Sequence, residues 1–404
     1  MEHPRQHVPV ASSEPPYAQI SVNASELMTR AREQAAITGI DDAPIEEPLQ
    51  QFLNALNTEA ELSDTGARAL ENILLLILCN RLRMQRDLRD HPEIDAEKID
   101  RPVILSSGAR TGSTKLHKLL AASGDFHYLP CWRGISLSLL SGDRGEHPAQ
   151  RIAQADAWVR WFNEHAPEAR YTHEFSTFEP EEENLLLAHD LFGQYMIAFT
   201  FVPSFAQWAM TESRVLRNMQ FLKRALQYLQ WQFPSAMPRR WVLKSPAYPG
   251  LEPALAHVFP DARFVVTHRD PVASLASSAS LIDAFQRAFS NVERKVTIGQ
   301  LLQEGQARAW QQIVVAREEN PHLPFADIAY RQVVEAPEHA VECVYQHADM
   351  TLSNVARERI CNWERSYGTT DWKTRRYTLE EYGLTPDQVR LRYAGYIERF
   401  QEFL

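Results

Sequence analysis

The sequence predicts an α/β fold in which a parallel sheet is flanked by helices. Short apolar runs rich in β-branched residues lead into polar turns and helical patterns at four places: "RPVIL" (101–105), "RRWVLKSPAYPG" (239–250), "DARFVVTHRDP" (261–271) and "FADIAYRQVVEAP" (325–337). Strands that alternate with helices favour a parallel sheet covered on both faces. Ligands of such sheets bind beyond the carboxyl ends of the strands, so the polar turns form the candidate site.

Helical patterns precede and interrupt the predicted strands. We expect a flexible tail over residues 1–22, which are polar and rich in proline, and an N-terminal helical section over 23–98. The first helix of that section is expected to be capped near Ser25 and Glu26 and to stop at Gly39. The α/β domain then spans residues 99–404. A helical insertion at about 150–235 interrupts it, and the spaced aromatic residues of this insertion are expected in the core.

Composition excludes several classes of protein. The chain has 404 residues and a formal net charge of -10, which argues against a general nucleic-acid binder. Its most apolar run, residues 73–79, is far shorter than the roughly 20 residues of a membrane span. The four cysteines form no CxxC pair and no zinc-type cluster, so we expect reduced thiols, no metal site and a cytoplasmic location.

The first polar turn has the form of an anion-binding loop. "SSGARTGSTKLHKLL" (106–120) follows a predicted strand, contains two glycines and continues as a helix. It does not fit the pattern G-x-x-x-x-G-K-[ST], because the two glycines are one residue too close and Lys115 follows the hydroxyl residues. Backbone amides at the start of the helix can still hold an anion, and Arg110 adds a cation. The loop therefore predicts a P-loop-like site, although a plain connecting turn is an equal alternative for it alone.

Two further turns carry groups suited to anions. Arg269 follows the strand "VVTH", and Ser277 lies about two turns into the next helix. Lys244 ends the strand "WVLK" and precedes Ser245. Read singly, Arg269 could equally pair with a carboxylate, Ser277 could pack between helices, and Lys244 could reach solvent from a strand end. Because all three motifs follow parallel strands, we expect them at one edge of the sheet.

The ordered set "ARTGSTKLH", "VLKSP" and "VVTHRDP" resembles the sulfotransferases that use 3′-phosphoadenosine-5′-phosphosulfate (PAPS), and in particular a bacterial branch with a P-R-T-G-type loop. The resemblance extends from about residue 25 to residue 403. It implies a P-loop-like α/β fold with the helical insertion on the substrate side. It also implies transfer of a sulfuryl group from PAPS to a hydroxyl of a small molecule, with no metal required.

The resemblance also assigns roles to matching positions. The loop residues Arg110, Thr111, Gly112, Ser113 and Thr114 would bind the 5′-phosphate and the sulfuryl group, with Arg110 against the bridging oxygen. Arg269 and Ser277 would hold the 3′-phosphate, and Lys244 would lie near the transferring group. Arg375 and Arg376 in "KTRRY" are further candidates for the 3′-phosphate, and solvated charge is their alternative.

The catalytic base is the point at which the chain departs from this pattern. The branch commonly has a histidine four residues after the lysine of "LKSP", and this chain has Tyr248 there. A neutral tyrosine, with an ordinary pKa near ~10, is a poor base at neutral pH. His173 is the replacement we favour, an acidic acceptor such as a phenol is another solution, and His117 and His268 are weaker candidates. The acidic run 179–184 is expected to be a solvated helix start, or else to select a cationic or polyhydroxyl acceptor.

Two other functions remain open from the sequence. One is an ATP-dependent kinase of the P-loop type, against which the misplaced lysine argues. The other is a catalytically weak nucleotide-binding protein, which the tyrosine at position 248 favours. The apolar and aromatic content of the middle helices favours an acceptor that is partly apolar. For the oligomeric state, a homodimer is possible.

Overall fold

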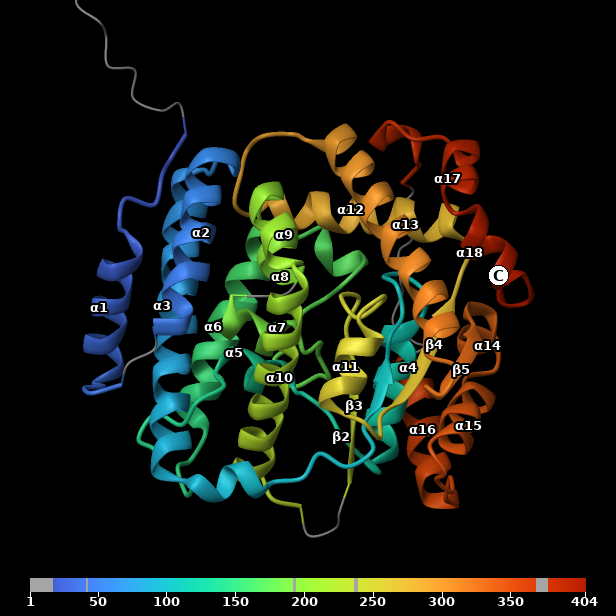
Figure 1. The fold of residues 1–404 in the computed structure, drawn as a ribbon, viewed down its shortest axis with the longest axis horizontal. Helices are drawn as coiled ribbons and strands as arrows, with labels where there is room; N and C mark the ends of the chain where they lie inside the picture. The colour runs from blue at the N-terminus through green and yellow to red at the C-terminus, as the bar shows by residue number, and fades with distance from the viewer. Residues whose placement is uncertain (1–16, 41–42, 192–193, 236–238, 368–376) are drawn as a thin grey trace, which may run out of the picture.

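The computed structural model of the chain describes residues 17–40, 43–191, 194–235, 239–367 and 377–404. Its sheet has five parallel strands in the order β2-β3-β1-β4-β5. Their bounds are β1 Val103–Leu105, β2 Phe126–His127, β3 Arg240–Lys244, β4 Arg263–His268 and β5 Phe325–Ala329. The predicted parallel α/β fold is confirmed, and each of the four predicted strands contains an observed one (Figure 1).

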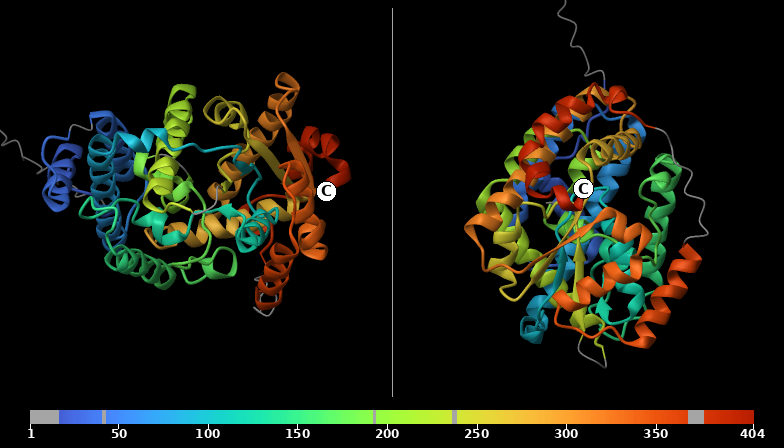
Figure 2. Two further views of the ribbon diagram at one scale, coloured as in Figure 1. Left: turned by 90° about the horizontal axis from the view of Figure 1, so that it is seen from below. Right: turned by 90° about the vertical axis from the view of Figure 1, so that its right-hand side faces the viewer.

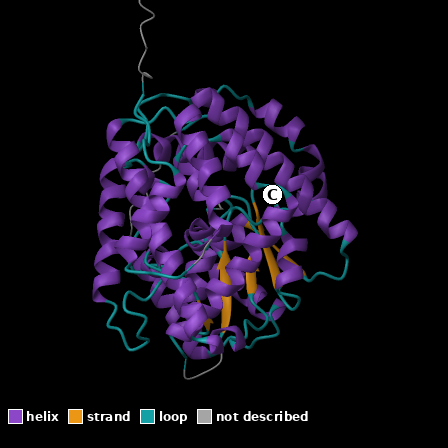
Figure 3. Ribbon diagram, turned by 60° about the vertical axis from the view of Figure 1, so that its left-hand side comes forward, coloured by secondary structure: helices purple, strands orange, loops and turns teal. Residues whose placement is uncertain are grey.

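Helices surround the sheet, as Figure 3 shows. The longer ones are α1 Ala24–Ala35, α2 Ala43–Glu59, α3 Asp64–Asp90, α4 Ser113–Ser123, α6 Ala149–His165, α10 Glu212–Gln232, α12 Pro271–Arg287, α13 Lys295–Glu319, α15 Pro337–His347 and α16 Asn354–Tyr367. The shorter ones are α5 Cys131–Ile135, α7 Asn184–Leu187, α8 Gln194–Phe199, α9 Pro203–Ala209, α11 Glu252–Val258, α14 Tyr330–Glu335, α17 Pro386–Arg392 and α18 Ala394–Arg399. No helix in these described ranges is long and apolar enough to cross a membrane.

Successive side chains of β1 lie on opposite faces of the sheet and so contribute to two different parts of the core. Val103 and Leu105 pack with residues of α4, α15 and α16, whereas Ile104 faces the opposite side. Ile104 belongs to the same core cluster as residues of α1–α3, α6 and α10, so the N-terminal helices and the insertion share one core. These helices lie on the same side of the molecule in the left view of Figure 2. The expectation of core aromatics in the insertion is confirmed for Phe162, Phe199 and Phe205, which are buried, whereas Trp158 and Trp161 are partly buried.

The first helix differs in detail from its prediction. Asn23, not Ser25, is its N-cap, because the Asn23 side chain accepts a hydrogen bond from the backbone of Glu26 at 2.9 Å. The helix ends at Ala35, and its C-cap, Ala36, adopts a left-handed conformation with a φ of 54°, three residues before Gly39. The cap is set by whichever side chain can reach a free amide of the first turn, and Asn23 is in that position.

Candidate active site

The loop between β1 and α4 forms the floor of the candidate site. Arg110 and Gly112 have φ angles of 66° and 90°, so the chain turns sharply before α4 begins at Ser113. Gly108 lies against the ring of Trp310, where a Cβ atom would come within 2.4 Å of the tryptophan Cζ2. No side chain caps the amino end of α4. Its first amides are therefore available to an anion, as the sequence predicts.

The hydroxyl groups of this loop point in different directions. The Thr111 hydroxyl donates to the Gly108 carbonyl at 2.8 Å and lies 2.7 Å from the hydroxyl of Thr267. Thr111 and Ser113 are only 1% and 2% exposed. Thr114 instead accepts a hydrogen bond from Lys244 Nζ at 3.1 Å. At the loop, the Thr114 side chain and the backbone amides therefore offer the direct contacts to an anion.

Lys244 brings to the loop the ammonium group that the loop itself lacks. It ends β3, which pairs with β1, and it is 4% exposed. Besides Thr114, its Nζ contacts the carboxylate of Glu182 in a buried ion pair. The Lys244 backbone amide donates to Glu183 at 2.6 Å. Two successive carboxylates thus fix both ends of this residue beside the amino end of α4.

A second cluster joins Arg110, Ser277 and Arg269. Arg110 Nε donates to the Ser277 hydroxyl at 2.9 Å, and Arg269 donates to the Arg110 carbonyl at 2.9 Å. The Arg269 guanidinium lies 4.1 Å from the centre of the Tyr330 ring, at the start of α14. The structure therefore brings together the residues that the sequence assigns to two phosphates, because β1 and β4 are neighbours in the sheet.

The acidic run 179–184 differs from its expectation. We predicted a solvated helix start, but Glu181, Glu182, Glu183 and Asn184 are 5%, 7%, 0% and 1% exposed. The reason is that the groups at the end of β3 need acceptors: Lys244 uses two of these carboxylates, and the Ser245 hydroxyl donates to Asn184 at 2.9 Å. The prediction of a solvated run was therefore wrong.

His173 lies beside this buried run. Its Nε2 atom is 3.1 Å from a carboxylate oxygen of Glu181. Burial on its own would raise the pKa of Glu181, but the interaction with His173 outweighs burial and lowers that pKa. One side-chain nitrogen of His173 and one carboxylate oxygen each of Glu181 and Glu182 lie within 4.8 Å of one another. Arg110 donates to the carbonyl of Thr172, so the histidine segment is joined directly to the loop.

The other candidate bases are buried. Tyr248 is 0% exposed, and its hydroxyl donates to Glu183 at 3.1 Å. Burial, and to a smaller extent the charge of Glu183, raise the pKa of Tyr248 well above its usual value. His117 is 1% exposed, and burial with the charge of Lys244 lowers its pKa to about 3.

His268 is bonded on both ring nitrogens, to Tyr396 at 2.9 Å and to Asp327 at 2.7 Å. Both of its ring nitrogens therefore already have partners within the protein, and the residue is fully buried. Arg375 and Arg376 lie outside the described residues.

The sequence gives little indication of three polar residues around the site. Glu182 belongs to a run whose composition suggests solvation. Glu252 lies at the start of α11, is fully buried and accepts a hydrogen bond from Ser106 at 2.6 Å, directly behind the loop. Tyr377 donates to the Ser277 hydroxyl at 2.7 Å from 100 residues away. Proline after the buried Glu252 marks a helix start, but nothing local predicts the partner of any of the three.

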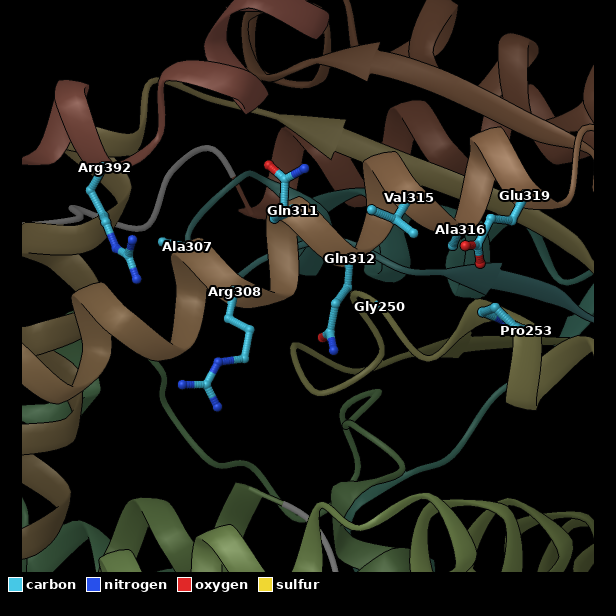
Figure 4. A pocket seen from close by; sticks show the side chains of 10 residues that line it. All are labelled: Gly250, Pro253, Ala307, Arg308, Gln311, Gln312, Val315, Ala316, Glu319 and Arg392. Carbon is cyan, nitrogen blue, oxygen red and sulfur yellow. The ribbon is translucent and has the colours of Figure 1, made fainter.

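A surface hollow of about 450 Å³ lies between α13 and the turn at Gly250. Figure 4 shows the side chain of Gln312 extending from α13 toward that turn, with Arg308 one turn earlier on the same helix. None of the predicted site residues lines this hollow. We therefore do not assign it to the donor or to the acceptor.

Comparison with known proteins identifies the family. A family model described as "Sulfotransferase family" matches residues 102–354, more than half of the chain. The structure is similar to sulfotransferase STF9 from Mycobacterium avium, with a TM-score of 0.80, 24% identity, and coverage of 94% of this chain and 96% of that one. It is also similar to sulfotransferase STF1 from Mycobacterium tuberculosis H37Rv, with a TM-score of 0.75, 26% identity, and coverage of 94% and 100%. No curated protein matches the chain. The protein belongs to the sulfotransferase family, and it is an enzyme that transfers sulfuryl groups.

Proposed function

We propose that the donor is PAPS and that the acceptor is a hydroxyl group of a small molecule. The observation that carries this proposal is the set of contacts made by the loop 106–112 and the start of α4. Thr114 contacts Lys244, while Arg110 contacts both Ser277 and the carbonyl that precedes His173. One loop therefore joins a group for the sulfuryl, a group for a second phosphate and a candidate base, which are the parts that transfer from a 3′-phosphorylated nucleotide needs.

The donor side is supported by the distribution of cations. In this proposal the amides of residues 111–114 hold the 5′-phosphate, and Lys244 with Arg110 neutralises charge on the bridging oxygen as the sulfur–oxygen bond breaks. Arg269 and Ser277 hold the 3′-phosphate. The acceptor oxygen attacks sulfur opposite the leaving phosphate, so the products are the sulfated acceptor and 3′-phosphoadenosine-5′-phosphate.

The acceptor side is supported by the pairing of His173 with Glu181. With its Nε2 hydrogen directed at that carboxylate, the imidazole has Nδ1 as its basic atom, and Nδ1 takes the proton of the acceptor hydroxyl. Glu181 then stabilises the imidazolium that forms. Tyr248 does not fit this role in the described conformation, because it is fully buried and its phenol already donates to Glu183.

The test is turnover of PAPS with a panel of phenols, alcohols and sugars, in which the acceptor gains the mass of one sulfuryl group. A calorimetric titration with 3′-phosphoadenosine-5′-phosphate measures donor-site binding separately. Tyr248→Phe is the control variant, since it should bind this nucleotide as the wild type does. The proposal fails if the nucleotide does not bind, or if the protein turns over ATP with magnesium and leaves PAPS unchanged.

Two further statements remain our predictions from the sequence. One is a cytoplasmic location, for which the reduced state expected of the four cysteines is the argument. The other is a homodimer, which sedimentation analysis of the purified chain would test.

A further inference from the structure

A phenol group near the end of the chain contacts the side chain that we assign to the 3′-phosphate. The Tyr377 hydroxyl donates to Ser277 Oγ at 2.7 Å, and Arg110 Nε donates to the same oxygen at 2.9 Å. Ser277 is 1% exposed within α12, and Tyr377 is half-buried. The segment that begins at Tyr377 therefore lies on the donor side of the sheet and places a neutral hydrogen-bond donor there.

The Ser277 hydroxyl accepts its hydrogen bonds and donates none among the described residues. A serine oxygen can accept two hydrogen bonds and donate one. Arg110 and Tyr377 supply both of the donors, and no acceptor for the Ser277 proton is found in the described part of the chain. Nearby, Arg269 has no carboxylate partner among the described residues, and it contacts a carbonyl and an aromatic ring instead.

Such a surplus of donors is suited to an anion with several oxygens. A phosphate monoester offers strong acceptors to guanidinium, hydroxyl and phenol groups at once, and hydrogen bonds to it are roughly twice as strong as neutral ones. A phosphate oxygen that accepts a hydrogen bond from Ser277 would lie near the Tyr377 hydroxyl, because the two hydroxyl oxygens are 2.7 Å apart. The contact with Ser277 holds the ring in place before the nucleotide arrives.

We propose that Tyr377 is a specificity-determining residue whose phenol donates a hydrogen bond to the 3′-phosphate of the donor nucleotide. It thereby helps the enzyme to distinguish 3′-phosphorylated adenosine nucleotides from adenosine 5′-phosphate. This inference rests on the proposed function, since it takes PAPS as the donor. It adds a residue from the end of the chain to the arginine and serine that the loop and α12 contribute.

The test compares the affinities of two nucleotides for the full chain by calorimetry. In Tyr377→Phe, we expect the dissociation constant of 3′-phosphoadenosine-5′-phosphate to rise about 10- to 100-fold, the effect of removing a hydrogen bond to a charged group. The affinity for adenosine 5′-phosphate, which lacks the 3′-phosphate, should stay within about twofold. A merely structural role for the ring would change both affinities together.

Two controls keep the result interpretable. Tyr393→Phe makes the same chemical change in the same C-terminal region, where the phenol donates only a 3.4 Å hydrogen bond to Gln303, and it should alter neither affinity. Ser277→Ala combined with Tyr377→Phe should cost less than the two single effects added, because the groups act on one phosphate.

The outcomes separate the two proposals. Wild-type protein that does not bind 3′-phosphoadenosine-5′-phosphate overturns the proposed function and this inference with it. Wild-type protein that prefers this nucleotide, with an unchanged preference in Tyr377→Phe, overturns the inference alone. A parallel loss of both affinities in Tyr377→Phe also overturns it.

Discussion

The buried carboxyl of Glu252 makes the stability of the protein depend on pH in a predictable direction. Glu252 is 0% exposed behind the loop 106–112, where it accepts a hydrogen bond from Ser106. Burial raises its pKa from 4.5 to about 7, although the Ser106 hydrogen bond acts in the opposite direction. We expect Glu252→Gln, which keeps the size and an acceptor oxygen, to remove this dependence.

The sign follows from where the protons are bound. Between pH 4.5 and 7 the folded protein retains the Glu252 proton, while the unfolded chain has released it. The free energy of unfolding therefore falls as pH rises through this interval, and the contribution of Glu252 is constant above it. At about 1.36 kcal/mol for each pH unit, the full loss is ~3 kcal/mol, and most of it falls between pH 5 and pH 8.

Urea denaturation of the wild type and of Glu252→Gln at pH 5, 6, 7 and 8 measures this effect. The free energy of unfolding of the variant, relative to wild type, should rise by about 2–3 kcal/mol across the series. Other titrating groups cancel in this difference if they are far from position 252. Glu318→Gln, which removes an exposed carboxyl on α13, is the control and should show no such trend. A difference that does not change with pH would refute the reasoning.

Three further predictions concern the site and its support. Arg269→Ala should weaken binding of 3′-phosphoadenosine-5′-phosphate about 10- to 100-fold in a titration, since it removes a charged donor from the phosphate; unchanged affinity would contradict the assignment. His173→Gln should lower kcat about 10²- to 10⁴-fold in the acceptor assay and leave nucleotide affinity unchanged, as expected for a base. Gly108→Ala should lower the free energy of unfolding by about 1–3 kcal/mol, because its Cβ would lie 2.4 Å from Trp310. Gly305→Ala, which meets nothing within 4 Å, should not destabilise the protein in the same denaturation assay.

Local pattern was sufficient to predict most of the sheet. β1, β3, β4 and β5 are apolar runs bounded by turns, and each lies within a range predicted from the sequence. β2 consists of Phe126 and His127 alone and pairs with only two residues of β3. A strand of two residues has no periodicity, so its pairing is decided by the packing of the elements around it.

The candidate site was predictable where chemistry follows a strand directly. Arg110 and Arg269 come after strands and Lys244 ends one, and parallel pairing brings those strand ends to one edge. The place of these basic residues at strand ends does not predict which side chains neutralise or contact them. Glu182 is buried because a strand far along the chain ends in a lysine, and Tyr377 contacts a serine 100 residues earlier. Such partners depend on tertiary contacts that neither composition nor local spacing contains.

The arrangement of charge explains why the loop can differ from the pattern G-x-x-x-x-G-K-[ST]. In that pattern the lysine belongs to the loop itself, whereas here it comes from β3 and is held by Glu182 and Thr114. A buried ammonium without a carboxylate partner would be costly, so the acidic run has to lie against the end of β3. Glu181 precedes Glu182 in the chain, and side-chain atoms of His173 and of both carboxylates lie within 4.8 Å of one another. The same carboxylate run that neutralises the lysine therefore also orients the histidine that we propose as the base, which couples the donor side of the site to its acceptor side.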